Sequence, residues 1–231
     1  MNINQAHIIV PKTAKYSIVG ELSSKTKYLW LVLHGYGHLS AYFIRKFRTL
    51  CNEETVIVAP EALHRFYLNG SEGRVGASWM TKEEREYDIK DYLQYLDLLI
   101  DNVLKNHPEN LKILALGFSQ GGATLSRWIC NTKHPLNAYI LWASVFPPDM
   151  QMDKLPANLK GYFIAGNQDE YLKSEQINSF QNFIKENGLN LSVESFQGNH
   201  SIPENVLHEM SQRIYSNLSS SQPEYSNYEK K

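Results

Sequence analysis

The residues of this chain that could do chemistry begin with Ser119, in the run Gly117-Phe118-Ser119-Gln120-Gly121-Gly122. The run follows an apolar segment, Lys112–Leu116, and precedes a helical pattern. A nucleophile on a tight strand-to-helix turn needs small neighbours two positions away, which Gly117 and Gly121 supply. Such a turn lifts the hydroxyl above the sheet edge and aims helix N–H groups at developing negative charge. The pattern favours a nucleophilic serine over a tight turn with a buried serine.

A serine nucleophile needs a base to remove its proton and an acid to orient that base. After a strand–turn–helix serine, the acid and the histidine come later in the chain, in that order. Asp169 lies in the turn Gly166-Asn167-Gln168-Asp169-Glu170, and His200 ends the turn Gln197-Gly198-Asn199-His200. Both turns follow predicted strands and fall at the carboxyl edge of the sheet, where sites of open α/β folds lie. We therefore predict a triad of Ser119, Asp169 and His200.

Each partner of Ser119 has an alternative interpretation. Asp169 would also serve as the cap of the helix that follows it. His200 would also fit a turn that precedes a helix cap at Ser201, although no other histidine follows a glycine-containing turn after the last predicted strand. The other candidate acids are Glu170, Asp149 and Asp153.

A loop earlier in the chain could complete the site. Leu33-His34-Gly35-Tyr36-Gly37 follows a predicted strand, and its glycines let a backbone N–H turn toward the serine. We expect the N–H groups of Tyr36 and Gln120 to form an oxyanion hole. His34 is a conceivable base, but its place in this loop favours a structural hydrogen-bonding role.

The elements that position these residues alternate between short apolar runs and longer runs of helical period. This alternation predicts an α/β fold with a mostly parallel sheet. The first two strands are too close for a helical crossover, so they should pair as a hairpin. The eight expected strands are Ala6–Val10, Tyr16–Val19, Tyr28–Leu33, Thr55–Ala59, Lys112–Leu116, Ala138–Ala143, Gly161–Ala165 and Leu191–Phe196.

Three helices have clear terminal signals. A capping box at Thr81-Lys82-Glu83-Glu84 opens one helix, which should end before Pro108. A second box, Ser201-Ile202-Pro203-Glu204, opens the last helix with Pro203 at its first position. A third helix should stop at Asn187-Gly188. We expect one domain over residues 1–218 and a polar, disordered tail over residues 219–231.

The predicted pocket rests on aromatic residues near the serine. The stretch His64–Met80 is expected to be a long loop, and its Trp79 could form a wall for an acyl chain. Phe146, after the strand Ala138–Ala143, could form another, although ordinary packing of aromatics explains both equally well. The stretch Ser144–Lys160 is too short and proline-rich for a separate lid domain, which favours an open pocket for short or medium acyl chains.

Taken together, His34-Gly35-Tyr36-Gly37, Gly117 to Gly122, Asp169 and His200 resemble the α/β-hydrolase fold. More narrowly, they resemble the phospholipase/carboxylesterase family, which includes acyl-protein thioesterases. The resemblance covers about Tyr28 to Leu218 and implies a central, mostly parallel eight-stranded sheet flanked by helices. It also implies a Ser-Asp-His triad, hydrolysis of acyl esters or thioesters, and no cofactor. The departures from the family pattern, which favour a branch with other substrates, lie at His38-Leu39-Ser40, Ala165-Gly166 and Asn199.

Composition limits the partners of the chain. Its 23 Lys+Arg against 24 Asp+Glu give a net charge of −1, so no nucleic-acid partner is expected. No run reaches the roughly 20 apolar residues of a membrane span, and Met1–Gln5 lacks signal-peptide features, which favours a cytoplasmic location. Cys51 and Cys130 are too few for a zinc site, so no metal is expected.

These observations predict a carboxylic ester hydrolase that acts through an acyl-enzyme on a small-molecule acyl ester. The same groups would also serve an acyl-thioesterase or a small serine peptidase. A non-catalytic binding protein on a hydrolase scaffold is a further alternative, because a fold does not fix a function. The sequence is compatible with a homodimer.

Overall fold

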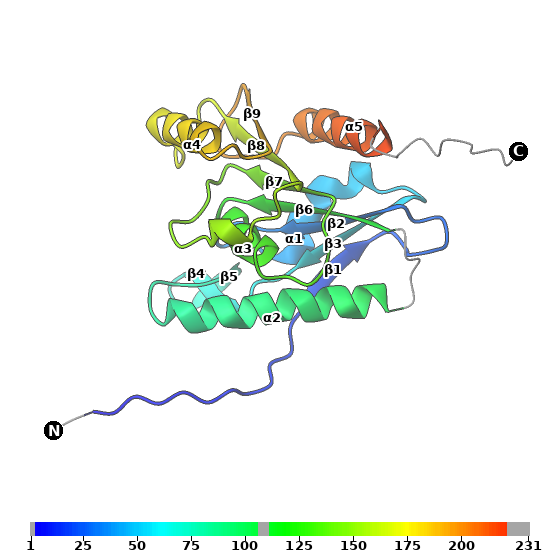
Figure 1. Cartoon of the computed structure of the whole chain (residues 1–231). Coiled ribbons are helices and arrows are strands. Elements are labelled where there is room, and N and C mark those ends of the chain that lie inside the picture. Colours follow the sequence, from blue (N-terminus) through cyan, green and yellow to red (C-terminus); the bar gives the residue numbers. More distant parts are fainter. Residues whose placement is uncertain (1–2, 106–110, 221–231) are drawn as a thin grey trace, which may run out of the picture.

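The computed structural model describes residues 3–105 and 111–220. Within these residues, seven strands form one sheet in the order β1-β3-β2-β6-β7-β8-β9, and only the β1–β3 pair is antiparallel (Figure 1). The mostly parallel sheet expected from the sequence is therefore confirmed. Its strands are β1 (Tyr16–Val19), β2 (Tyr28–Leu33), β3 (Thr55–Pro60), β6 (Lys112–Phe118), β7 (Ala138–Trp142), β8 (Lys160–Gly166) and β9 (Leu191–Phe196).

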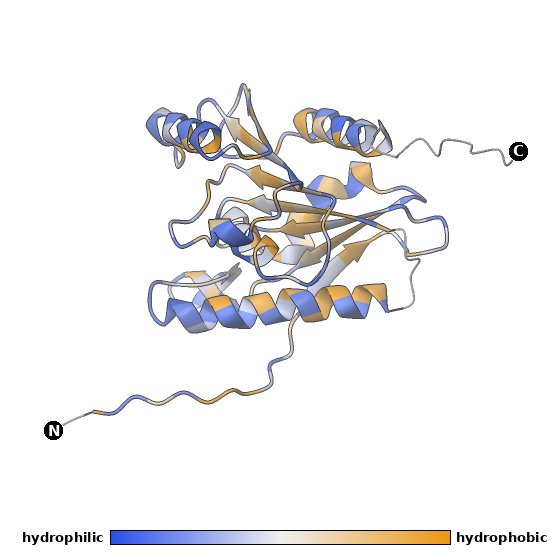
Figure 2. Ribbon diagram, in the orientation of Figure 1, coloured by the Kyte–Doolittle hydropathy of each residue, from blue (hydrophilic) through white to orange (hydrophobic). Residues whose placement is uncertain are grey.

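Helices cover both faces of this sheet. Along β2, Leu29 and Leu31 pack with one core cluster, whereas Trp30 and Val32 pack with the other, because successive side chains of a strand point to opposite faces. Strands buried on both faces are therefore almost continuously apolar, as Figure 2 shows. The first face carries α2 (Arg85–Leu104), α3 (Gln120–Ile129) and α4 (Ser174–Glu186), and the second carries α1 (Ser40–Phe43), the 3-10 helix η1 (Ile44–Leu50) and α5 (Glu204–Ser220).

The central sheet has seven strands among the described residues, so the predicted eight is wrong. Ala6–Val10 forms no strand, and its Ile8 and Ile9 side chains are 85% and 86% exposed. The predicted hairpin is wrong as well, because Tyr16–Val19 pairs with β3 instead. Strand composition alone does not make a strand, which also needs a neighbouring strand to pair with. The other seven predicted strands are confirmed to within two residues at either end.

The stretch His64–Met80 was expected to be a loop, and this expectation is wrong. It contains an antiparallel hairpin of β4 (His64–Asn69) and β5 (Glu72–Ser78). The turn uses Gly70 and Gly73, both with positive φ. The pair Asn69-Gly70 is a strong hairpin signal that could have predicted this element.

The capping predictions had mixed outcomes. Helix α2 begins at Arg85 rather than after Thr81, and its cap residue Glu84 has a left-handed backbone and no side-chain capping bond. Helix α5 begins at Glu204, and the Pro203 carbonyl accepts from the Leu207 N–H, so Pro203 rather than Ser201 occupies the cap position.

The predicted helix ends are confirmed where the structure describes them. Helix α2 ends at Leu104, ahead of Pro108, and α4 ends at Glu186 with Gly188 in the left-handed region. Of the predicted tail, Ser219 and Ser220 lie in α5, and residues 221–231 are outside the described residues.

Candidate active site

Ser119 lies on a strained turn between β6 and α3. Its backbone has φ 53° and ψ −120°, and it is one of three non-glycine residues with positive φ among those described. Such backbone conformations cost free energy and cluster at functional sites. The Ser119 N–H donates a 2.9 Å hydrogen bond to the Trp142 carbonyl, which ties the turn to the neighbouring end of β7.

Three glycines allow this turn to be tight. A Cβ atom on Gly117 would collide with the backbone of Gly121, and one on Gly121 would collide with the Leu33 carbonyl at the end of β2. A Cβ atom on Gly122 would collide with the Ser144 side chain. The requirement for small residues at Gly117 and Gly121 is thus visible in the structure, and Gly122 adds a close approach to the segment after β7.

Asp169 and His200 are in direct contact at the ends of β8 and β9. The Nδ1 atom of His200 lies 2.7 Å from Oδ2 of Asp169, whose carboxylate is fully buried. The other carboxylate oxygen accepts hydrogen bonds from the backbone N–H groups of Tyr171 and Leu172. A proton on Nδ1 is therefore held by Asp169, which leaves Nε2 of His200 as the nitrogen able to accept one.

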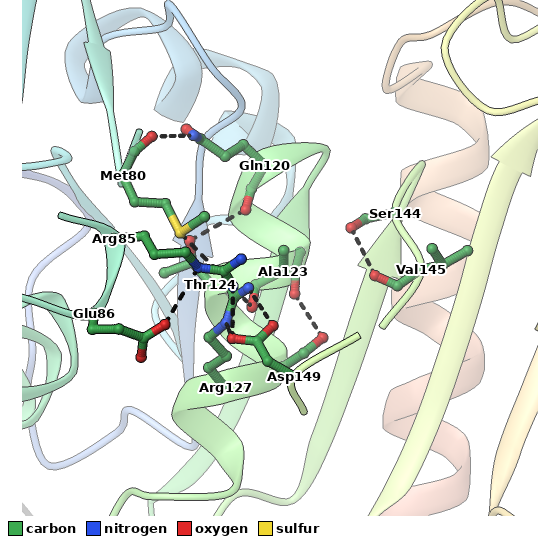
Figure 3. Close-up of polar contacts among 12 residues, drawn as sticks. Met80, Arg85, Glu86, Gln120, Ala123, Thr124, Arg127, Ser144, Val145 and Asp149 are labelled. Carbon is green, nitrogen blue, oxygen red and sulfur yellow. Dashed lines mark hydrogen bonds and ion pairs between the residues drawn. The ribbon is translucent and has the colours of Figure 1, made fainter. Parts of the chain in front are cut away.

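The alternative acids do not contact His200 in the described part of the chain. Glu170 and Asp153 are exposed. Asp149 instead accepts two hydrogen bonds from Arg127, at 2.7 and 3.0 Å, and one from Arg85 at 2.8 Å (Figure 3). The hydrogen bond from Arg127 is the main reason that the pKa of Asp149 lies below its usual value.

Phe118 links Ser119 to the other parts of the site. Its ring lies 4.8 Å from the His200 ring, centroid to centroid. On the side of the loop after β2, a Cβ atom on Gly35 would lie 3.0 Å from the Phe118 ring and 3.2 Å from Cβ of Ser119. The nucleophile turn, the loop after β2 and His200 therefore meet around one aromatic ring.

The predicted oxyanion donors are the N–H groups of Tyr36 and Gln120. Among the described residues, neither of these two N–H groups forms a hydrogen bond, whereas Gly37 donates to the Ala77 carbonyl. Gln120 is the first residue of α3, where backbone N–H groups have no partner within the helix. Its side-chain amide donates to the Met80 carbonyl at 3.0 Å and so anchors this end of α3 to the segment after β5 (Figure 3).

His34 is confirmed as a structural residue. Its ring is fully buried, Nδ1 contacts the Gly35 carbonyl at 2.8 Å, and the Ala62 N–H donates to Nε2 at 3.0 Å. Because Nε2 accepts, Nδ1 carries the proton. Burial lowers the pKa of His34 to about 4, so the ring is neutral near pH 7.

The structure places Trp79 in the core rather than on a pocket wall. Its side chain is 1% exposed, and its indole N–H donates a 2.8 Å hydrogen bond to the His34 carbonyl. Trp79 therefore supports the loop after β2. The prediction that Trp79 forms a wall for an acyl chain is wrong. The apolar stretch Ser78-Trp79-Met80 signalled burial rather than ligand contact.

Phe146 does line a cavity. This cavity, which we call the Phe146 cavity, has a volume of about 480 Å³ and lies between the segment after β7 and α4. The Phe146 ring meets the Phe180 ring edge-on at 5.1 Å. None of its lining residues belongs to the nucleophile turn, and the two are linked through Ser144, which precedes Val145 and approaches Gly122.

Two residues near the site were not found from the sequence. The His38 ring lies parallel to the Phe118 ring at 5.9 Å, and burial, followed by the charges of Lys46 and His200, lowers the pKa of His38. The Tyr171 ring lies 4.8 Å from His200 and is 72% exposed. The only signals in the sequence were that His38 follows the Gly35–Gly37 loop and that Tyr171 lies two residues after Asp169. No group of three or more candidate metal ligands occurs among the described residues.

Comparison with known proteins identifies relatives of this chain. The model of the phospholipase/carboxylesterase family matches residues 14–218. No curated protein matches the sequence significantly. None of the described helices is long and apolar enough to cross a membrane.

Solved structures share the fold at low sequence identity. Acyl-protein thioesterase 2 from Zea mays is 17% identical with a TM-score of 0.68, over 89% of this chain and 100% of that one. The carboxylesterase from Bacillus cereus is 15% identical with a TM-score of 0.64, over 88% and 94%. Esterase PE8 is 20% identical with a TM-score of 0.62, over 89% and 99%. These likenesses establish an α/β-hydrolase fold.

Proposed function

The chain belongs to the phospholipase/carboxylesterase family, and from that premise we propose that it is a serine hydrolase that cleaves carboxylic esters through an acyl-enzyme. The observation that carries the proposal is the 2.7 Å contact between His200 and the buried carboxylate of Asp169, at the sheet edge that bears Ser119. A buried carboxylate that fixes an imidazole tautomer is the arrangement that activates a serine.

The reaction would begin when the Ser119 hydroxyl attacks the ester carbonyl and its proton passes to Nε2 of His200. Asp169 stabilises the imidazolium that forms, and the N–H groups of Tyr36 and Gln120 bind the oxyanion. Collapse of the tetrahedral intermediate breaks the ester bond, and His200 gives the proton to the departing alkoxide. Water then repeats the sequence on the acyl-enzyme and releases the carboxylic acid.

The acyl chain would enter the Phe146 cavity. Its walls include Val145, Met150 and Phe183 in addition to Phe146 and Phe180, and these side chains are apolar. A volume of about 480 Å³ is within the usual range for small-molecule sites and suits an acyl chain of short or medium length.

A thioester would react through the same groups, and the Zea mays relative is named an acyl-protein thioesterase. The choice between ester and thioester is measurable as a ratio of kcat/KM values for one acyl group on oxygen and on sulfur. A non-catalytic binding role is disfavoured by a strained Ser119 turn and a histidine–carboxylate pair on the same edge, because strain costs stability.

The proposal is tested with p-nitrophenyl esters of graded chain length and a fluorophosphonate probe. We expect hydrolysis that peaks at short or medium chains, and a single labelled peptide that contains Ser119. Ser119→Ala should abolish both, and Ser144→Ala is the matched control, since that serine also lies beside the turn. Labelling of Ser144 or Ser78 in place of Ser119 would contradict the proposal.

A further inference from the structure

A second cavity borders the candidate active site. This cavity, which we call the His38 cavity, has a volume of about 650 Å³ and is lined by the loop after β2, α1, η1 and β5. Lys46 and Arg74 come from two separate elements and both line it. The cavity therefore has two positively charged side chains, and no acidic residue lines it.

Both of these cations are exposed, and among the described residues neither Lys46 nor Arg74 forms an ion pair or a side-chain hydrogen bond. Other cations that reach another element do find a partner, as Lys133 does with the Asp101 carboxylate and Lys112 with the Leu218 carbonyl, at 2.8 and 2.9 Å. Two unpaired like charges facing one hollow repel each other, so the arrangement favours an anion between them.

The His38 cavity borders the candidate active site. His38 lines it, and its ring lies parallel to the Phe118 ring at 5.9 Å. Phe118 also contacts the His200 ring, at 4.8 Å. A ligand group beside His38 is thus close to the candidate base, whose charge acts on His38.

The two cavities differ in charge and polarity. The Phe146 cavity is mainly apolar, and its one charged residue is Glu175, which would repel an anion. The His38 cavity combines Lys46 and Arg74 with the rings of Tyr42 and Phe43. An ester has two halves, and these surroundings suit an apolar acyl chain on one side and an anionic group on the other.

We propose that the His38 cavity binds an anionic oxyacid group, a carboxylate or a phosphate, on the alcohol or thiol half of the substrate. Arg74 offers a planar fork of donors and Lys46 a compact point charge, and both suit such a group. Tyr42 and Phe43 would contact the apolar part that joins the anion to the ester. The inference rests on the proposed function and narrows its substrates to esters or thioesters with an anionic leaving half.

The test compares 4-carboxyphenyl butyrate with the neutral compound in which its carboxylate is a methyl ester. Each rate is corrected for spontaneous hydrolysis. We expect wild type to prefer the carboxylate about tenfold in kcat/KM at low salt, and this preference to shrink as NaCl is added. The butyrate ester of 4-hydroxyphenyl phosphate is the third substrate. The anion, carboxylate or phosphate, that gives the larger increase in kcat/KM over the neutral ester is the one that the cavity prefers. Phenyl hydrogen succinate, with the anion on the acyl half, should show no gain over its methyl ester.

Variants assign the preference to the two cations. Lys46→Ala and Arg74→Ala should each reduce the preference several-fold, and the double variant should abolish it, while hydrolysis of the neutral ester stays unchanged. Arg48→Ala is the matched control, because Arg48 is an exposed cation on η1 that does not line the cavity.

Three results would overturn the inference: equal rates on neutral and anionic esters, an equal effect of Arg48→Ala, or a preference that survives in the double variant. Each of these requires an active enzyme. An enzyme that hydrolyses no ester and takes no label at Ser119 would instead contradict the proposed function, so the two failures are distinguishable.

Discussion

Two aspartates follow neighbouring strands of the sheet, and they have different kinds of partner. Asp149, after β7, is bound by the guanidinium groups of Arg127 and Arg85. Asp169, after β8, is bound by two backbone N–H groups and by the His200 ring. A guanidinium group keeps its proton at every working pH, whereas an imidazole gains and loses one near neutrality. Only the surroundings of Asp169 therefore offer proton transfer.

Burial increases the difference between the two. The Asp169 carboxylate is fully buried, whereas the Asp149 side chain is 36% exposed. Charges interact more strongly where water is excluded, so Asp169 can stabilise a transient imidazolium effectively. Asp149 instead holds α3 to the segment that leads to the Phe146 cavity (Figure 3). We therefore propose that Asp169 takes part in the reaction and that Asp149 supports the structure.

The largest effect that separates these roles is expected from Asp169→Asn. An amide keeps the shape and can still accept from Tyr171 and Leu172, but it can present a donor to His200 and favour the wrong tautomer. We expect kcat for p-nitrophenyl butyrate to fall about 10⁴-fold with little change in Tm. Glu170→Gln is the matched control and should stay within about tenfold of wild type. Near-normal kcat in Asp169→Asn would remove the distinction between the two aspartates.

His34 sharpens the comparison, because it is a histidine without a proton-transfer role. Its folded pKa of about 4 is below the unfolded value of about 6.5, so the unfolded state binds the proton first. Stability contributed by neutral His34 is complete above pH 6.5 and is lost as pH falls toward 4. The loss should reach about 3 kcal/mol.

Urea denaturation at pH 7 and pH 4.5 measures this loss. His34→Gln removes the titrating group, so its stability should depend less on pH than that of wild type. The exposed His208 provides the control, and His208→Gln should keep the wild-type pH dependence. An unchanged pH dependence in His34→Gln would show that His34 does not limit stability in acid.

Sequence reasoning succeeded where a local pattern of residues determines the structure. The interior strands are continuous apolar runs, and Asp169 and His200 meet because turns after parallel strands share one edge. It failed at Ala6–Val10, whose composition resembles a strand but which has no pairing partner in the structure.

The parts of the site that sequence reasoning missed depend on contacts between distant residues. The sequence favoured Asp169 but could not assign a role to Asp149, because the arginines that hold Asp149 come from α2 and α3. The position of His38 likewise depends on its contact with Phe118, from another strand. Trp79 was misassigned because its partner, the His34 carbonyl, belongs to a distant loop. Spacing along the chain carries no information on such contacts.

The smallest effect belongs to Asp149 itself and concerns stability rather than catalysis. Asp149→Asn leaves the Arg127 guanidinium, whose side chain is only 7% exposed, with an amide in place of a countercharge. The loss of its charged partner destabilises a buried cation strongly and an exposed one only slightly. We therefore expect the free energy of unfolding to fall by about 2 kcal/mol. Arg85→Ala, which removes the more exposed arginine, should cost no more than about 1 kcal/mol. Urea denaturation at pH 7 measures both, and both variants should hydrolyse p-nitrophenyl butyrate within tenfold of wild type. If Asp149→Asn instead lost activity 10³-fold at unchanged stability, Asp149 rather than Asp169 would be the carboxylate that serves the reaction.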